Sequence, residues 1–333
     1  MMQNFNITRR RMIAITATAL GSAFVSGTRF ARADEAVRWH GSALGAQVSM
    51  EIHHPNRAEA ERLVKSCLLD VRGLEQQFSL YRTDSAICEL NRTGILVSPG
   101  PDMVALLRAA LSFADLTDGA FDPTVQPLWR LHADHFSSAH PDPDGPSREM
   151  LAEALSRVGR SGLRVGTDRI ALAHRGAAIT LNGIAQGYAT DRVVEKLRAA
   201  GFSTTLVDMG EIRTIGPRPE GGPWRVGLAD PDRPGATTQA IDLVDRAVAT
   251  TAGAGFRFDP AGRFTHLFDP KTGLSPALYR TVSVIAPTAT EADALSTAFS
   301  LMAIPQVANI VAVRPNVQAR IIDSNGASIV CGT

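Results

Sequence analysis

The sequence predicts an α+β fold in which mixed β-sheets carry flanking helices. Short segments of alternating apolar and polar residues follow one another in runs, and this alternation is typical of half-buried strands. The helical period occurs in isolated segments between these runs, so strands and helices do not repeat as βαβ units. Hydrophobic residues make up 44% of the 333-residue chain and charged residues 20%, which is ordinary for a globular protein.

The first 33 residues are predicted to be an export signal and not part of the fold. Three arginines at 9–11 precede an apolar run at 12–25, and small residues at 31 and 33 fit a signal-peptidase site. The order Thr-Arg-Arg-Arg-Met-Ile fits a twin-arginine signal, which directs a folded chain to the periplasm. The alternative is a membrane anchor. We disfavour it because the apolar run is shorter than the roughly 20 residues that span a bilayer, and we expect the cleaved chain not to span the membrane.

The first third of the mature chain is predicted to form one strand followed by helices. Residues 44–52 alternate as a strand does. Asn56 is a favourable N-cap for a helix that runs to about Gln76, because apolar residues recur there every three to four positions. Further helices are expected at 84–92 and at 101–117, where an Asp-Gly pair ends the second one.

The polar stretch 132–147 is predicted to be a surface loop, inserted into a single lobed domain that covers residues 34–333. Its histidines suggest a metal site as an alternative, which we disfavour because histidines in a loop rich in Pro and Asp are usually solvated. The net charge of +1 and the absence of a basic block argue against nucleic-acid binding. Three unevenly spaced cysteines do not form a disulfide framework, although one bond stays open: Cys67, Cys88 and Cys331.

The rest of the chain is predicted to be rich in strands. Residues 177–182 are expected to form a strand that leads through a glycine turn into a helix at 184–200. The last third predicts a strand at 281–286, a helix at about 290–302, a second helix and two closing strands. The other strands are expected at 163–166, 169–173, 203–209, 212–216, 224–229, 238–244 and 247–251.

Two segments have a pattern that suits a phosphate and its metal ion. Gly183 lies in the turn before the predicted helix, and the N-terminus of a helix offers free N–H groups to phosphate. Asp293 and Thr297 are four residues apart, so on a helix they share one face and present oxygen ligands that suit Mg²⁺. The alternatives are a structural turn and a carboxylate that only favours the helix dipole.

Two further segments suggest a base and a binding surface for a flat ring. His266 lies near Asp269 in a predicted turn and is a candidate general base, since histidine titrates near neutral pH. A structural histidine is the alternative. Tyr81 and the turn Ala120-Phe121-Asp122 each place an aromatic ring beside polar groups, which suits stacking, although either could belong to the core.

Taken in order, these motifs resemble the ApbE family, the FAD:protein FMN transferases. The resemblance runs from about Trp39 to the C-terminus and implies the ApbE-like, T-fold-related arrangement of mixed sheets with flanking helices. The motifs that carry it are FSLYRTDSAICELN, GAFDPTVQPLW, LNGIAQGYATDRV, WRVGLADP, FTHLFDPKTG and SVIAPTATEADALSTA.

The resemblance implies that FAD is the substrate, that Mg²⁺ is required, and that FMN is joined through a phosphoester to a Thr or Ser of a target flavoprotein while AMP leaves. It implies that His266 is the base and that Asp293 takes part in catalysis. The metal set would be the Gly183 carbonyl, Asp293 and Thr297 with Ser296 close by. The residues implied to contact FAD are Leu44, Tyr81, Ala120, Phe121, Asp122, Thr180, Gln186 and Leu267.

The sequence departs from the usual family pattern at two positions. Thr180 stands where the family often has an aspartate, and Gln186 stands where a lysine is usual. These departures leave two alternatives open, a flavin carrier without turnover and an FAD pyrophosphatase that releases FMN and AMP. The form LNGIAQGY together with the export signal is similar to the NosX-type branch, associated with nitrous-oxide reduction, which implies a membrane-bound, NosR-like flavoprotein as the target.

Overall fold

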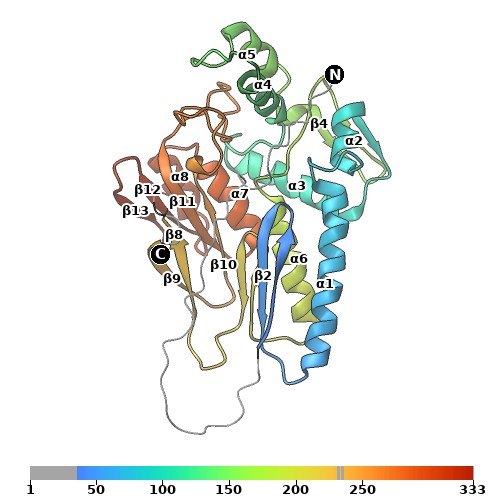
Figure 1. The fold of residues 1–333 in the computed structure, drawn as a ribbon, viewed down its shortest axis with the longest axis vertical. Helices are drawn as coiled ribbons and strands as arrows, with labels where there is room; N and C mark the ends of the chain where they lie inside the picture. Colours follow the sequence, from blue (N-terminus) through green and yellow to red (C-terminus); the bar gives the residue numbers. More distant parts are fainter. Residues whose placement is uncertain (1–35, 231–232, 234–235, 333) are drawn as a thin grey trace.

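The computed structural model describes residues 36–230, 233 and 236–332, so the predicted export signal at 1–33 lies outside the described residues. The described chain forms antiparallel sheets with helices packed against them, which confirms the predicted α+β class (Figure 1). No helix of this part of the chain is both long and apolar enough to cross a bilayer.

An eight-stranded antiparallel sheet is the centre of the fold, in the order β1-β2-β6-β7-β10-β11-β12-β13. Its first hairpin corrects the prediction of one strand at 44–52, because Leu44 and Gly45 form a tight turn between two strands. Their φ angles of 50° and 83° match the twist of a two-residue hairpin. The strands are β1 (Val37–Ala43), β2 (Ala46–Ile52), β6 (Thr205–Asp208), β7 (Ile212–Ile215), β10 (Ala247–Thr251), β11 (Tyr279–Ala286), β12 (Gln318–Asp323) and β13 (Ser328–Cys331).

Two smaller sheets accompany this central sheet in the described chain. One is the hairpin of β8 (Trp224–Ala229) and β9 (Thr237–Leu243), and the other has the order β3-β5-β4. The bounds in the second sheet are β3 (Ile95–Val97), β4 (Leu163–Val165) and β5 (Arg169–Leu172).

The predicted strand at 177–182 is wrong, because these residues belong to no strand although several are buried. The side chain of Asn91 satisfies the backbone there in place of a neighbouring strand. Its amide donates to the Ile179 carbonyl at 2.8 Å and its carbonyl accepts from the Ile179 N–H at 2.7 Å. A buried backbone must be hydrogen-bonded, but a side chain serves as well as a strand.

The predicted helices form close to their expected bounds. Asn56 caps the first one as predicted, because its side chain accepts from the Glu59 N–H at 3.1 Å. Cys67 is buried on this helix, and all three cysteines are free. The helices are α1 (Arg57–Phe78), α2 (Ala86–Thr93), α3 (Pro101–Leu116), α6 (Ala185–Ala199), α7 (Ala289–Phe299) and α8 (Ile304–Ala312).

Two helices were not predicted from the sequence, α4 (Gln126–Phe136) and α5 (Arg148–Leu155). The first corrects the predicted loop at 132–147, because it continues five residues into that stretch. His132 is 2% exposed there, and its Nδ1 lies 2.9 Å from the Leu128 carbonyl. Three phenylalanines surround this histidine within 5.7 Å between ring centroids, so it belongs to an aromatic core and not to a solvated loop: Phe258, Phe264 and Phe268.

Helices and a hairpin cover the two faces of the large sheet. Helices α1 and α6 pack side by side on the face of β1, β2 and β6, where Val64, Val193 and Met50 join one core (Figure 1). Helix α7 lies against β10 and β11. The hairpin β8–β9 covers the opposite face, where Trp224 and Leu243 pack on the sheet. Because α6 contacts β6 and β7 and α7 contacts β10 and β11, both helices are held against the sheet.

Helices α6 and α7 approach each other so closely that only glycine fits at position 187. A Cβ atom at Gly187 would lie 2.8 Å from Cβ of Asp293 and would collide with the backbone carbonyl of Ala289. Backbone atoms in a packed helix cannot move aside cheaply. The contact therefore sets the distance between the two helices.

We expect Gly187→Ala to lower the free energy of unfolding by about 2 kcal/mol or more, because the added methyl group forces the helices apart. Gly73→Ala is the matched control, since Gly73 is also helical and a Cβ there meets nothing within 4 Å. The control is expected to raise the free energy of unfolding by roughly 0.5–1 kcal/mol. Urea unfolding of both variants measures the difference, and equal effects at the two positions would contradict the close approach.

Candidate active site

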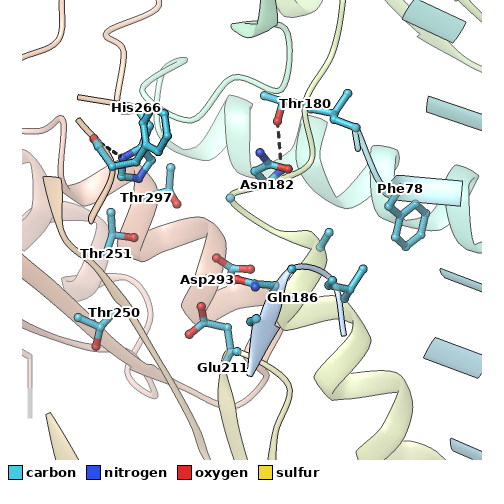
Figure 2. A pocket seen from close by; sticks show the side chains of 18 of the residues that line it. Phe78, Thr180, Asn182, Gln186, Glu211, Thr250, Thr251, His266, Asp293 and Thr297 are labelled. Atoms are coloured by element: carbon cyan, nitrogen blue, oxygen red, sulfur yellow. Dashed lines mark hydrogen bonds between the residues drawn. The ribbon is translucent and has the colours of Figure 1, made fainter. Parts of the chain in front are cut away.

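A cavity of about 720 Å³ opens where the N-terminus of α6, one face of α7 and the ends of β6 and β10 meet (Figure 2). Segments far apart in the sequence line it together. Every residue that the sequence singled out for the site lines this cavity except Ser296, namely Leu44, Tyr81, Ala120, Phe121, Asp122, Thr180, Gly183, Gln186, His266, Leu267, Asp293 and Thr297.

The turn at Gly183 and the helical face of α7 converge in this cavity. A Cβ atom at Gly183 would lie 2.9 Å from Oγ1 of Thr297, so the glycine backbone and this hydroxyl are direct neighbours. Asp293 lies one helical turn before Thr297 on the same face. The structure thus brings together the three residues that the sequence predicted as oxygen donors.

Asp293 is buried and is held in one orientation. Its Oδ2 accepts a hydrogen bond from the Gly187 N–H at 3.0 Å, at the start of α6. Burial raises the pKa of Asp293 to about 7, the hydrogen bond from Gly187 opposes this rise, and the charge of Asp191 adds to it. The carboxylate is therefore desolvated, and a cation would stabilise its charged form.

Two further carboxyl groups in the cavity were not predicted from the sequence. Asp208 ends β6 and Glu211 precedes β7, with Gly210 at a φ of 104° in the turn between them. Figure 2 shows the carboxylate of Glu211 beside that of Asp293. The available signal was two acids close together between apolar strands, but the prediction placed Asp208 inside the strand 203–209 and left Glu211 between this strand and the next.

Burial strongly affects both of these acids. It raises the pKa of Asp208 to about 6, although the Gly210 N–H donates to Oδ1 of Asp208 at 3.0 Å. It also raises the pKa of Glu211 well above its usual value, and the nearby charges of Asp293 and Asp208 raise it further. The cavity thus concentrates acidic groups whose charged forms are disfavoured unless a cation is bound.

The oxygen donors of the cavity fit Mg²⁺ only together with a phosphate ligand. Within residues 36–230, 233 and 236–332, no three acidic, histidine or cysteine side chains form a metal site by themselves. Mg²⁺ is commonly held by one or two carboxylates while substrate phosphates complete its shell. The Asp293 carboxylate, the Thr297 hydroxyl and the Gly183 backbone provide such a partial set.

The start of α6 also suits a phosphate. Gln186 is the second residue of this helix, and its backbone N–H donates to no acceptor within the described chain. Such a free N–H at a helix N-terminus, together with the helix dipole, attracts an anion. The Gln186 side chain packs over Gly210, where a Cβ atom would lie 2.9 Å from its amide carbon.

His266 lies across the cavity from Gln186 and is set up to accept a proton (Figure 2). Its Nδ1 is 3.4 Å from the Phe256 carbonyl, so Nδ1 carries the hydrogen when this contact forms and Nε2 is the free acceptor. Burial lowers the pKa of His266, which keeps the ring neutral at neutral pH. Both properties are those of a general base.

Aromatic side chains form the apolar wall of the cavity. Tyr81 is 57% exposed at the entrance, whereas Phe121 is 5% exposed. Trp129 and Phe256 lie 6.2 Å apart between ring centroids, and both line the cavity. The sequence predicted the first two residues but not the second two, because only the unpredicted helix α4 places Trp129 there.

Two predicted site residues have structural contacts instead. The carboxylate of Asp122 is taken up by its own chain, because it accepts from the Thr124 N–H at 2.8 Å and from the Arg160 N–H at 3.2 Å. Ser296 is 1% exposed and does not line the cavity. Its hydroxyl lies 2.7 Å from that of Thr251, which does line the cavity, so Ser296 supports the wall from behind.

Thr180 lies at the cavity edge in a tight local turn. Its backbone N–H donates to the Pro123 carbonyl at 2.7 Å, and its hydroxyl accepts from the Asn182 N–H at 3.2 Å. These bonds tie the segment before Gly183 to the loop after Phe121. Thr180 therefore fixes the entry of the chain into the Gly183 turn.

Comparison with known proteins finds one family and several similar chains. The family model described as "ApbE family" matches residues 44–321. An FAD:protein FMN transferase of Treponema pallidum is 31% identical over 289 residues, which cover 80% of this chain and 78% of that protein. The one of Haemophilus influenzae is 30% identical over 247 residues and covers 70% of each chain. The crystal structure of the ApbE protein from Thermotoga maritima superposes with a TM-score of 0.77 at 30% identity, over 89% of this chain and 96% of that one.

We expect Asp208→Asn to stabilise the metal-free protein at pH 7 but not at pH 4. Because burial raises the folded-state pKa of Asp208 to about 6, this carboxyl group favours folding below its unfolded pKa of about 4, and the contribution is lost as the pH rises through the folded value. Asparagine stays neutral and keeps the acceptor for the Gly210 N–H. The free energy of unfolding should therefore rise by about 2 kcal/mol at pH 7.

Urea unfolding in EDTA at both pH values measures this effect. Asp134→Asn is the control, because Asp134 is an exposed aspartate on α4. A gain for Asp208→Asn that is equal at pH 4 and pH 7 would show that its charge is not the cause.

Proposed function

The chain belongs to the ApbE family and is an FAD:protein FMN transferase, and we propose that it needs Mg²⁺ and modifies a flavoprotein target in the periplasm. The observation that carries the proposal is the single cavity in which the Gly183 turn, the Asp293–Thr297 face and His266 meet. A diphosphate between the first two features would lie within reach of the third.

Binding of FAD would divide the cavity into a polar and an apolar part. The free N–H of Gln186 and the dipole of α6 would hold the diphosphate. The rings of Tyr81, Phe121 and Trp129 offer flat surfaces for the two ring systems of FAD. Because reactive groups held in place react as if highly concentrated, this positioning is a large part of catalysis of phosphoryl transfer.

The proposed reaction moves the FMN phosphoryl group from AMP to a hydroxyl group. The oxygen of the acceptor Thr or Ser bonds to the FMN phosphorus, and the bond from that phosphorus to the bridging oxygen breaks. The electron pair of this bond leaves with AMP. The hydroxyl proton passes to Nε2 of His266, which is free because Nδ1 is directed at the Phe256 carbonyl.

The carboxyl groups of the cavity supply the reason for a metal requirement. Asp293 is held by Gly187 with one oxygen, which leaves the other oxygen for an ion beside Thr297. Mg²⁺ bound there would neutralise charge on the diphosphate and stabilise the leaving AMP. In their charged forms and without a cation, Asp293 and Glu211 would repel a diphosphate.

The proposed periplasmic location of the protein and the proposed flavoprotein target are inferred from the sequence alone. The segment at 1–33 has the features of a twin-arginine signal, and the mature chain would act in the periplasm. The likeness to the NosX-type branch points to a membrane-bound, NosR-like flavoprotein whose soluble side faces the same compartment. The enzyme would reach the acceptor hydroxyl through the open side of the cavity.

We expect the mature protein with FAD and Mg²⁺ to release AMP only when a target domain with its acceptor threonine is present, and to leave fluorescent flavin on that domain in a denaturing gel. Asp293→Asn should slow this reaction by roughly 100-fold or more, because it removes a charge that binds the metal. A target domain with the acceptor threonine changed to alanine is the control.

The same assay separates the alternatives. Free FMN and AMP without a target would identify an FAD pyrophosphatase. Tight FAD binding without AMP release would identify a flavin carrier. An Asp293→Asn variant as fast as the wild type at limiting Mg²⁺ would refute the metal role.

We expect His266→Ala to slow the transfer from bound FAD by roughly 100-fold, which is the usual contribution of a general base, and to change FAD affinity by less than threefold. Single-turnover rates and fluorescence titration measure the two effects separately. His140→Ala is the control, since His140 is exposed in the loop after α4. Lost affinity with an unchanged rate for bound FAD would make His266 a binding residue.

A further inference from the structure

We propose that Asp191, which lies outside the cavity, is a positioning residue for the FMN transfer, because it fixes α7 and thereby the place of Asp293 and Thr297. This inference rests on the proposed function and assigns a role within the same site. It follows from the way in which α6 and α7 bind each other's N-termini.

Asp191 of α6 caps the N-terminus of α7. Its Oδ1 accepts from the Ala289 N–H at 2.8 Å, and its Oδ2 accepts from the Thr290 N–H at 2.9 Å and from the Thr290 hydroxyl at 2.5 Å. These are the first two residues of α7, whose N–H groups have no partner within their own helix. A carboxylate at this place also opposes the positive end of the helix dipole.

Asp293 of α7 makes the reciprocal contact at the N-terminus of α6. Its Oδ2 accepts from the Gly187 N–H, the third residue of that helix. Each helix thus supplies one aspartate to the start of the other, and Gly187 lets them approach. Two contacts of this kind define both the distance and the rotation of α7 relative to the Gly183 turn.

Arg213 makes the burial of Asp191 tolerable. Its Nη1 donates to Oδ1 of Asp191 at 2.6 Å, and the two side chains are only 9% and 7% exposed. The Nε atom of Arg213 is buried and has no hydrogen-bond partner among the described residues, so the guanidinium depends on Asp191. Removing the charge of Asp191 alone would leave Arg213 buried and unpaired, and a test must allow for that.

Asparagine at 191 can keep only half of the cap. Its single carbonyl oxygen can accept from either the Ala289 or the Thr290 N–H, and its amide group would face the other donor. The start of α7 is then free to shift, and the shift is passed to Asp293 one turn later. The expected defect is therefore weaker Mg²⁺ binding and not weaker contact with the flavin.

The experiment measures AMP release against Mg²⁺ concentration for the wild type and Asp191→Asn. We expect the half-saturating Mg²⁺ concentration to rise about tenfold, while KM for FAD at saturating Mg²⁺ changes less than threefold. Glu195→Gln is the matched control on α6, because Glu195 is exposed and pairs with Arg192. The control should stay within twofold of the wild type in both quantities.

A second readout does not depend on activity. Titrating Mg²⁺ in the presence of FAD raises the unfolding temperature of the wild type, and Asp191→Asn should need about ten times more Mg²⁺ for half of this rise. A double variant with Arg213→Gln removes the unpaired guanidinium and should recover the unfolding temperature but not the Mg²⁺ response. A merely structural Asp191 would instead lower the unfolding temperature and leave both half-saturating concentrations unchanged, which would overturn the proposal.

Thr290→Val serves if Asp191→Asn does not fold, because it removes only the hydroxyl contact to Asp191. It should raise the half-saturating Mg²⁺ concentration about threefold, and an unchanged value would overturn the positioning role. A wild-type protein that releases no AMP with its target would overturn the proposed function instead. The Mg²⁺ response of the unfolding temperature still reports on Asp191 in that case.

Discussion

The close approach of α6 and α7 at Gly187 is the constraint on which the site depends. Two helix N-termini meet there, and each would leave unpaired N–H groups in a buried place without a partner. Each helix supplies an aspartate that accepts from the N–H groups of the other helix. Asp191 of α6 accepts from the start of α7, and Asp293 of α7 accepts from the start of α6. The same contact that closes the core therefore also orients a carboxylate toward the Gly183 turn. The hydrogen bonds that hold the two helices together are thus the ones that orient Asp293. They require an approach so close that only glycine fits at position 187.

The site gathers acids where the fold has removed water. Asp208 and Glu211 line the same cavity as Asp293, because the turn between β6 and β7 lies at its wall. Burial disfavours the charged form of each acid. The charges of Asp293 and Asp208 also make it harder for Glu211 to lose its proton. Such a group of acids stores unfavourable electrostatic free energy in the absence of a ligand. A bound cation with a diphosphate would relieve it, so ligand binding and stability are linked in this fold.

The sequence predicted local features well and long-range neighbours poorly. The cap at Asn56, the glycine turn at 183 and the shared face of Asp293 and Thr297 all follow from spacings of a few residues, and the structure has each of them. Glu211 and Trp129 were missed because their place depends on strand pairing and on α4, which periodicity did not reveal. The strand expected at 177–182 failed for a related reason, since Asn91 takes the place of a strand from elsewhere in the chain. Asp122 lines the cavity as the sequence predicted, but its carboxylate also accepts from Thr124 and from the Arg160 N–H, contacts that local spacing did not reveal.

The side chain of Gln186 is neutral and adds no positive charge to the acidic groups of the cavity. A lysine at this position, which the family resemblance leads us to expect, would place a positive charge over Gly210, between Asp208 and Glu211 in the turn. Glutamine fills the same space and can donate a hydrogen bond, but it leaves the charge of the acids uncompensated. The charge of a bound diphosphate would add to theirs, and attraction at the helix N-terminus is small compared with that of a divalent ion at close range. With glutamine at 186, an ion beside Asp293 would therefore carry a larger share of the neutralisation than it would with lysine there, and the placement of Asp293 by the two crossed helix caps becomes correspondingly more important.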